Sequence, residues 1–167
     1  MNIPVRVEPS VASPAVVDYR WDSDTDILSA VMRSTGKGEM ARVTALELEG
    51  ADGSWLILDV RAGRISGIEV AVWPDVKTRA GLAPPAVVED GTVIVGAVER
   101  GKRLAVEVET TLAAEADGDE RTIHFRLGAT RETRTVRIAR DILVDIDRRD
   151  RIAGLWLLDV PPFPEES

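Results

Sequence analysis

The alternation of apolar and polar positions predicts a chain built mainly of short β-strands. The stretch from Ser54 to Trp73 is typical of a β-hairpin, since an apolar run ending at Asp59 is followed by a turn at Gly63 and a second apolar run. No segment shows the sustained period of a long amphipathic helix. We therefore expect antiparallel sheets with little helix.

A second stretch, from Asp141 to Val160, repeats the pattern of this hairpin. Asp59 is followed by Gly67, and Asp145 by Gly154, at nearly the same spacing, and an apolar residue follows each glycine. The repetition indicates an internal duplication. We predict two similar antiparallel halves packed about a pseudo-twofold axis, with Ile68, Val70, Val72, Val144 and Ile146 on the buried faces.

Proline and glycine positions set the expected boundaries of the two halves. Prolines make the first residues an extended arm or an edge strand at most, and a proline-rich run separates the halves. The predicted organisation is an arm (1–15), a first β repeat (16–73), a connection (74–91), a second β repeat (92–160) and a tail (161–167).

Three segments outside the hairpins carry more specific expectations. Glu39 to Glu49 fits either a helical face or a strand, and its position before the first hairpin favours a strand. Thr92 to Glu99 and the alternating run after Lys102 are expected to pair as a hairpin. Glu115 to Glu120 is expected to be an acidic loop.

Composition limits the classes of function. The 167 residues carry a formal net charge of −8 and include no cysteine, which excludes disulfides, thiolate nucleophiles and cysteine metal sites. An acidic surface repels phosphate backbones and attracts cationic proteins. With no apolar run long enough for a signal peptide or a membrane span, the expectation is a cytoplasmic protein that binds neither nucleic acid nor membrane.

Both halves resemble the YuzE-like family, a small bacterial domain of unknown function. The family pattern is an opening strand Tyr-Asp-x-x-x-Asp-x-Leu, a Thr-x-Glu-x strand and a closing Asp-x-Asp-x-x-Gly-x-Ile-x-Gly-Ile-Glu hairpin. In this chain the resemblance rests on the following residues of the first half: Tyr19, Asp22, Asp26, Leu28, Thr44 to Leu48, Asp59, Gly63, Ile65, Gly67, Ile68 and Glu69. In the second half it rests on Asp119 to Leu127, Thr135 to Ile138, Asp145, Asp147, Ile152, Gly154 and Leu155. Trp156 stands where the family has Glu, and the resemblance implies no activity.

Asp22, Asp24 and Asp26 have the spacing of the first ligands of a calcium-binding loop. The pattern fails at Ile27 and Arg33, where that loop requires Gly and Glu, so a hydrogen-bonded turn is the favoured interpretation. We expect no metal and no cofactor.

The remaining candidates are single residues. The carboxylates Glu69, Asp59, Asp145 and Asp147 could act as acid/base pairs only in a cleft that perturbs the pKa of one of them, and solvated strand ends are the favoured interpretation. His124, the only histidine, is expected on a solvated face. Trp55 and Trp156 are interpreted as core residues, whereas Trp73, before Pro74, is the candidate for an exposed contact.

Two hypotheses of function follow. The first is a non-catalytic protein-interaction or self-association module that uses sheet edges or neutralises a basic protein, as antitoxin and immunity proteins do. It is favoured because no catalytic constellation is recognisable. The alternative is a small hydrolase or lyase that uses carboxylates near Glu69 and the Asp22 to Asp26 turn.

Overall fold

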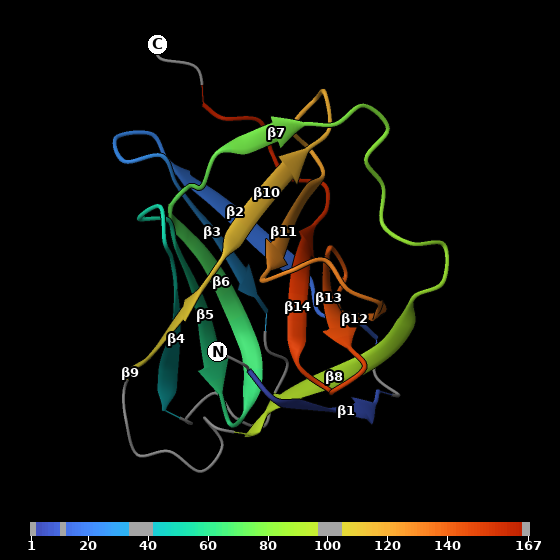
Figure 1. Ribbon diagram of the computed structural model, residues 1–167. Coiled ribbons are helices and arrows are strands. Elements are labelled where there is room, and N and C mark those ends of the chain that lie inside the picture. The colour runs from blue at the N-terminus through green and yellow to red at the C-terminus, as the bar shows by residue number, and fades with distance from the viewer. Residues whose placement is uncertain (1–2, 11–12, 34–41, 97–104, 165–167) are drawn as a thin grey trace.

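The computed structural model describes residues 3–10, 13–33, 42–96 and 105–164. Within these residues the chain is mainly β, as the sequence predicts, and it forms a single curled sheet of fourteen strands (Figure 1). The strands are β1 (Val5–Pro9), β2 (Val17–Asp22), β3 (Ile27–Met32), β4 (Val43–Gly50), β5 (Trp55–Arg61), β6 (Arg64–Val72), β7 (Val76–Thr78), β8 (Glu89–Val95), β9 (Ala105–Thr110), β10 (Leu112–Ala116), β11 (Ile123–Leu127), β12 (Thr133–Ala139), β13 (Ile142–Asp147) and β14 (Ile152–Leu157).

Strands β2 to β6 form a first antiparallel unit. They pair in the order β2-β3-β6-β5-β4, and β5 and β6 are the hairpin expected around Gly63. The left-handed backbone at Ala62 and Gly63 makes the tight turn between them. The ambiguous segment before this hairpin is strand β4, as favoured, although residues 39–41 lie outside the described part.

Strands β10 to β14 form a second antiparallel unit with a matching pairing order, β10-β11-β14-β13-β12. β13 and β14 are the second expected hairpin. Each closing hairpin is therefore central in its unit, between the opening strands on one side and the middle strand on the other.

Strand pairings and side-chain hydrogen bonds between residues far apart in the sequence join the two units. β8 pairs parallel with β12 and touches β6 at one position, while β9 pairs parallel with β4 and runs directly into β10. The hydroxyl of Tyr19 on β2 donates a 2.8 Å hydrogen bond to the carbonyl of Leu158. The indole N–H of Trp21 donates to the carbonyl of Pro161 at 2.8 Å, which holds the chain after β14 against β2.

One hydrophobic core lies between the inward faces of both units. Leu48, Leu58, Ile68, Phe125 and Leu155 are each at most 2% exposed and belong to one contiguous cluster. Burying large side chains of this kind contributes roughly 1.5–3 kcal/mol each. In the first unit the alternation of the strands leaves the outward face half-buried or exposed, whereas β13 and β14 of the second unit are buried at every position.

Three expectations about individual segments are wrong. The strands on either side of residues 97–104 do not pair with each other, because β8 pairs with β1 and β12 and β9 with β4. Glu115 belongs to β10, and the acidic loop begins after Ala116. Val72 is 47% exposed because it is the last residue of β6, beyond a register shift at Trp55.

Candidate interaction site

Each closing hairpin places an aspartate directly opposite a glycine. Asp59 on β5 pairs with Gly67 on β6, and Asp145 on β13 pairs with Gly154 on β14. The register shifts immediately after both aspartates. A Cβ atom added at Gly154 would lie 2.7 Å from a carboxylate oxygen of Asp145, so glycine is required for the aspartate to lie against the strand.

Asp145 and Asp147 are not the solvated strand ends that the sequence favours, since they are 6% and 4% exposed. Asp145 is the centre of a buried polar network. One carboxylate oxygen accepts hydrogen bonds from the Thr135 hydroxyl at 2.7 Å and the Trp156 indole N–H at 3.2 Å. The other oxygen is 2.8 Å from Nε2 of His124, whose ring stacks on Trp156 with centroids 4.1 Å apart. Asp145 is 6% exposed and Thr135 3%, so these donors satisfy a carboxylate that water hardly reaches.

His124 is therefore not the solvated surface residue that the strand pattern predicts. Its side chain is 21% exposed and is held by Asp145. The pattern placed it correctly on the outward face, but that face is buried in the second unit, where Leu143 and Trp156 also lie. Trp156 is buried as expected, but outside the main core cluster.

Asp59, the equivalent residue of the first unit, lies in a different environment. It is half-buried on the wall of an open pocket of about 410 Å³ that Arg33, Arg61 and Ser66 also line. Within the described residues its carboxylate has no hydrogen-bond donor comparable with those of Asp145. Burial raises the pKa of Asp59, and the nearby Arg61 guanidinium offsets part of this effect.

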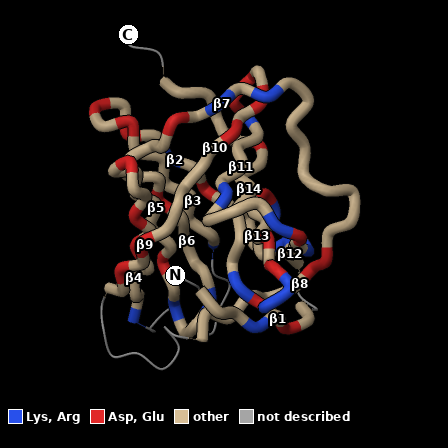
Figure 2. The backbone as a smooth tube through the Cα atoms, in the orientation of Figure 1, with Lys and Arg blue, Asp and Glu red and all other residues tan. Residues whose placement is uncertain are grey.

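An acidic face covers the outside of the first unit. It consists of Glu47, Glu49, Glu69, Glu107 and Glu109. In the parallel pairing of β4 with β9, Glu47 lies opposite Glu107 and Glu49 opposite Glu109. Figure 2 shows acidic residues gathered over β4 and β9. In the described part of the chain, none of these glutamates forms an ion pair with Arg or Lys.

Half-buried apolar side chains lie between the glutamates. Ile57 is flanked by Glu47 and Glu69 across the sheet. Trp55, which was expected in the core, is instead half-buried on this face, opposite Glu49. The indole N–H of Trp55 has no hydrogen-bond partner among the described residues. The face thus combines negative charge with half-buried apolar side chains at its centre.

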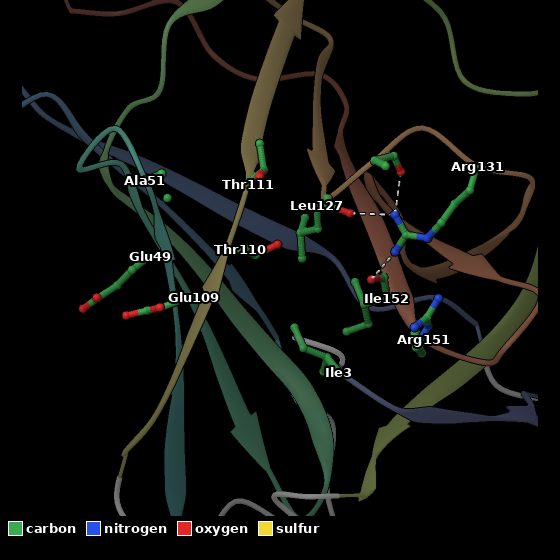
Figure 3. A pocket seen from close by; sticks show the side chains of 13 residues that line it. Ile3, Glu49, Ala51, Glu109, Thr110, Thr111, Leu127, Arg131, Arg151 and Ile152 are labelled. Carbon is green, nitrogen blue, oxygen red and sulfur yellow. Dashed lines mark hydrogen bonds between the residues drawn. The ribbon is translucent and has the colours of Figure 1, made fainter.

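A larger cleft borders the acidic face. It has a volume of about 680 Å³ and separates the ends of β4 and β9 from the second unit. In Figure 3 the side chains of Glu49 and Glu109 lie on one side, Arg131 and Arg151 on the other, and Ile3 between them. The glutamates point away from the arginines, so the two charged groups do not neutralise each other.

The predicted aspartate turn and Trp73 come together at one end of the first unit. The Asp22 carboxylate accepts a 3.0 Å hydrogen bond from the Asp24 amide, and the Asp26 amide bonds to the Asp22 carbonyl at 2.8 Å. Trp73 donates its indole N–H to the Asp26 carbonyl at 2.8 Å and stacks on Trp21. These contacts give the turn and the tryptophan a role in holding β2, β3 and β6 together.

Glu69 lies apart from this turn. It is opposite Ser29 and Ile57 in the middle of the sheet face, three residues before the end of β6 at Val72. The structure therefore groups Glu69 with the glutamates of β4 and β9, which the sequence did not single out. Their outward direction was visible in the alternation, but their opposition depends on the long-range pairing of β4 with β9.

An arginine-rich segment surrounds the turn between β13 and β14, and its charges are mostly paired. Arg131 and Arg151 contact Asp147 through Nε atoms at 2.8 and 2.9 Å, and Arg148 pairs with Glu132. Burial alone would raise the pKa of Asp147, but hydrogen bonds from these two arginines and from backbone amides lower it below its usual value. These ion pairs thus stabilise the turn between β13 and β14.

Comparisons with protein-family models and with curated proteins give no match for this chain. The described residues contain no helix that is long and apolar enough to cross a membrane.

Proposed function

We propose that this chain is a non-catalytic protein-interaction module that binds a cationic protein through the acidic face of its first unit. The observation that carries the proposal is the pair of like-charged cross-strand contacts, Glu47 with Glu107 and Glu49 with Glu109. Antitoxin and immunity proteins, which neutralise basic partners, are the functional class with this requirement.

The arrangement is unfavourable for the isolated fold. Like charges placed directly opposite on neighbouring strands destabilise a sheet, by up to about 1 kcal/mol per pair. A partner carrying Lys or Arg would convert this repulsion into attraction and would accelerate association. The half-buried Ile57 and Trp55 would supply the apolar centre of the contact.

The second unit shows that the fold does not need these like-charged pairs. The residue that corresponds to Glu47 is Arg137, since each lies two positions along the chain from the strand partner of the aspartate opposite glycine in its unit. Arg137 lies opposite Asp90 of the parallel strand β8, an ordinary pairing of opposite charges. The glutamate pairs are thus a feature of the first unit alone, which supports a role in binding.

The negative charge of β9 also favours a different, basic protein over a second copy of this chain as the partner at the β9 edge. β9 is the last strand in the pairing order, and such an edge can recruit another strand. Two copies joined there would bring Glu107 and Glu109 against the same residues of the neighbour. Homo-oligomerisation through sheet edges would then add repulsion, whereas a basic strand would remove it.

The proposal is tested by affinity capture from native lysate with two matched variants. The first carries Glu47→Gln, Glu49→Gln, Glu107→Gln and Glu109→Gln. The control carries the same charge change at exposed sites elsewhere, namely Asp24→Asn, Asp75→Asn, Asp119→Asn and Glu120→Gln. Captured proteins are identified and their affinities measured at low and high salt.

We expect the wild type and the control to retain the same basic protein, and the acidic-face variant to lose it. The wild-type interaction should weaken steeply with salt, because exposed charges are screened. Capture of the same partner by all three proteins, or capture of acidic partners only, contradicts the proposal. A strictly dimeric mass that depends on β9 would favour self-association instead.

We also propose that the two units are copies of a YuzE-like bacterial domain related by a pseudo-twofold axis, in a cytoplasmic protein that binds no nucleic acid. The shared pairing order and the two Asp-Gly pairs support the duplication, and the paired arginines support the absence of nucleic-acid binding. An experimental structure in which the two units fail to superpose would remove the duplication without affecting the acidic face.

A further inference from the structure

A pocket of about 220 Å³ lies where the first unit meets the second, and aromatic and proline side chains form much of its lining. Trp21 near the end of β2 and Trp73 directly after β6 belong to the first unit. Ile123 belongs to β11 of the second unit, and Phe163 lies in the segment after β14. None of the glutamates of the acidic face lines this pocket, so it is separate from the surface of the proposed function.

The aromatic rings form a corner with two walls. The indoles of Trp21 and Trp73 stack with their centroids 5.7 Å apart and their planes inclined by 21°. The Phe163 ring meets Trp21 at 77°, with the centroids 5.2 Å apart. Two rings that meet nearly at a right angle both turn a face toward the space between them, and the face of an aromatic ring carries its negative potential. Such a corner attracts a cation.

The two indole N–H groups are not available to a ligand. Trp21 donates to the carbonyl of Pro161 and Trp73 to the carbonyl of Asp26, each at 2.8 Å. These bonds hold the rings in place. Among the described residues that line the pocket, no other side chain carries a hydrogen-bond donor at neutral pH. The lining side chains therefore offer nothing that would bind an anion or donate to the hydroxyl groups of a sugar.

Two carboxylates stand at the rim of the pocket. Asp119 and Glu120 are exposed in the turn between β10 and β11. The amide of Glu120 donates to the Asp117 carbonyl at 3.0 Å. The amides of Arg121 and Thr122 donate to the Asp117 carboxylate at 2.8 and 3.1 Å, which fixes the turn. In the part of the chain that the structure describes, neither Asp119 nor Glu120 forms an ion pair, so both charges remain for a ligand.

The cationic residues next to the lining residues in the sequence do not neutralise this rim. Arg121 follows Glu120 and is ion-paired with Asp159. Lys77 follows Val76, which lines the pocket, and successive side chains of a strand point to opposite faces. The negative charge of the rim is therefore not compensated by either neighbour.

We propose that this pocket binds a small quaternary ammonium compound of the choline type, with a trimethylammonium head and a short chain that ends in a hydrogen-bond donor. The methyl groups need no hydrogen-bond acceptor and pack against the aromatic rings, whose faces attract the charge. Asp119 and Glu120 add Coulomb attraction and accept the hydrogen bond of the chain end. The volume, which is below the roughly 300–1,000 Å³ of drug-sized pockets, suits a compound of this size.

The test titrates the full chain with three probes at constant ionic strength. Choline chloride is the ligand, and 3,3-dimethyl-1-butanol is its uncharged isostere. N-acetyl-trimethyllysine methylamide carries the same head on a protein side chain. The chain has four tryptophans, so binding is followed by four indole N–H signals in NMR spectra. Trp21 and Trp73 report on the pocket, and Trp55 and Trp156, which do not line it, are internal references.

Matched variants separate the contribution of the ring from that of the rim. Phe163→Leu removes the ring and keeps an apolar side chain, whereas Phe163→Tyr keeps the ring. Asp119→Asn combined with Glu120→Gln neutralises the rim. Glu47→Gln combined with Glu107→Gln makes the same change of charge on the acidic face, outside the pocket, and is the control.

We expect choline to shift the signals of Trp21 and Trp73 and to leave the other two in place. The uncharged isostere should bind at least about tenfold more weakly. Phe163→Leu should weaken choline binding about fivefold, and Phe163→Tyr should change it by less than about twofold. The rim variant should also lose about fivefold, and by less in high salt, while the control stays within about twofold.

Equal binding of choline and its isostere, or unchanged affinity in both Phe163→Leu and the rim variant, would overturn the inference. Tighter binding of the trimethyllysine probe than of choline would overturn the assignment to a small compound. Phe163 is 41% exposed, so its substitution should leave the fold intact, and unfolding curves verify this. The rim variant keeps the test decisive if Phe163→Leu fails to fold.

Discussion

Removal of the two equivalent aspartates should destabilise the chain to very different extents. Asp145→Ala leaves the indole N–H of Trp156 and the hydroxyl of Thr135 without an acceptor in a buried site, and it removes the partner of the half-buried His124. An unsatisfied buried donor costs roughly 1–3 kcal/mol, and breaking a buried charged network costs about 3–5 kcal/mol. Asp59→Ala removes a carboxylate without such donors, so its cost should stay below about 1 kcal/mol.

Chemical denaturation at neutral pH measures both changes in the free energy of unfolding. A loss of about 3–5 kcal/mol is a large part of the 5–15 kcal/mol typical of a domain, so Asp145→Ala should shift the midpoint strongly. His124→Ala tests the same network from the other side and should be non-additive with Asp145→Ala. Equal destabilisation by Asp145→Ala and Asp59→Ala would refute the reasoning, because it would mean that the hydrogen bonds at Asp145 contribute nothing beyond the shared position.

Three further predictions concern the same units. Because the pKa of Asp147 is lowered in the folded state, its stabilising contribution is present above the unfolded-state pKa near 3.8 and is lost as the pH falls through the folded-state value. Chemical denaturation should therefore show Asp147→Asn to be less stable than the wild type at pH 7 and equally stable in strong acid. Gly154→Ala should lower the free energy of unfolding by about 3 kcal/mol and Gly67→Ala by about 1 kcal/mol, because an added Cβ would meet oxygen atoms at 2.7 Å in the first case and 3.3 Å in the second. Thermal unfolding ranks the stabilities of the two variants, and the reverse order would contradict the geometry. Glu107→Gln should stabilise the chain by about 0.2–1 kcal/mol in low salt and by less in high salt, and a destabilised variant would argue against repulsion with Glu47.

Local pattern was sufficient for the hairpins and for the aspartate-glycine pairs. The apolar runs on both sides of Gly63 specify β5 and β6 because alternation sets the buried face and the glycine permits a tight turn. The same reasoning located β13 and β14. It could not show that Asp145 would be buried, because burial of the outward face of the second unit depends on packing that no local period encodes.

Non-local pairing explains why the hairpin expected from β8 and β9 does not form. β8 and β9 are neighbours in sequence and both have strand patterns, so a hairpin was the simplest interpretation. In the structure they diverge to opposite units, where β8 pairs parallel with the middle strand β12 and β9 pairs parallel with the middle strand β4. The opposition of Glu47 and Glu107 is a consequence of this divergence. It joins residues too far apart in the chain for any sequence pattern to align.

The two units differ in the same way at both pairs of equivalent positions compared, namely in the surroundings of a charged side chain. In the second unit Asp145 is enclosed by donors, and Arg137 lies opposite a residue of opposite charge, Asp90, in the strand register. In the first unit Asp59 borders an open pocket, and Glu47 faces another glutamate. Both units support the same strand pairings, so the open charges are not required by the architecture. An uncompensated arrangement that costs stability and is confined to one exposed face is expected where binding is the selected property, and this supports the proposal that the first unit binds the partner.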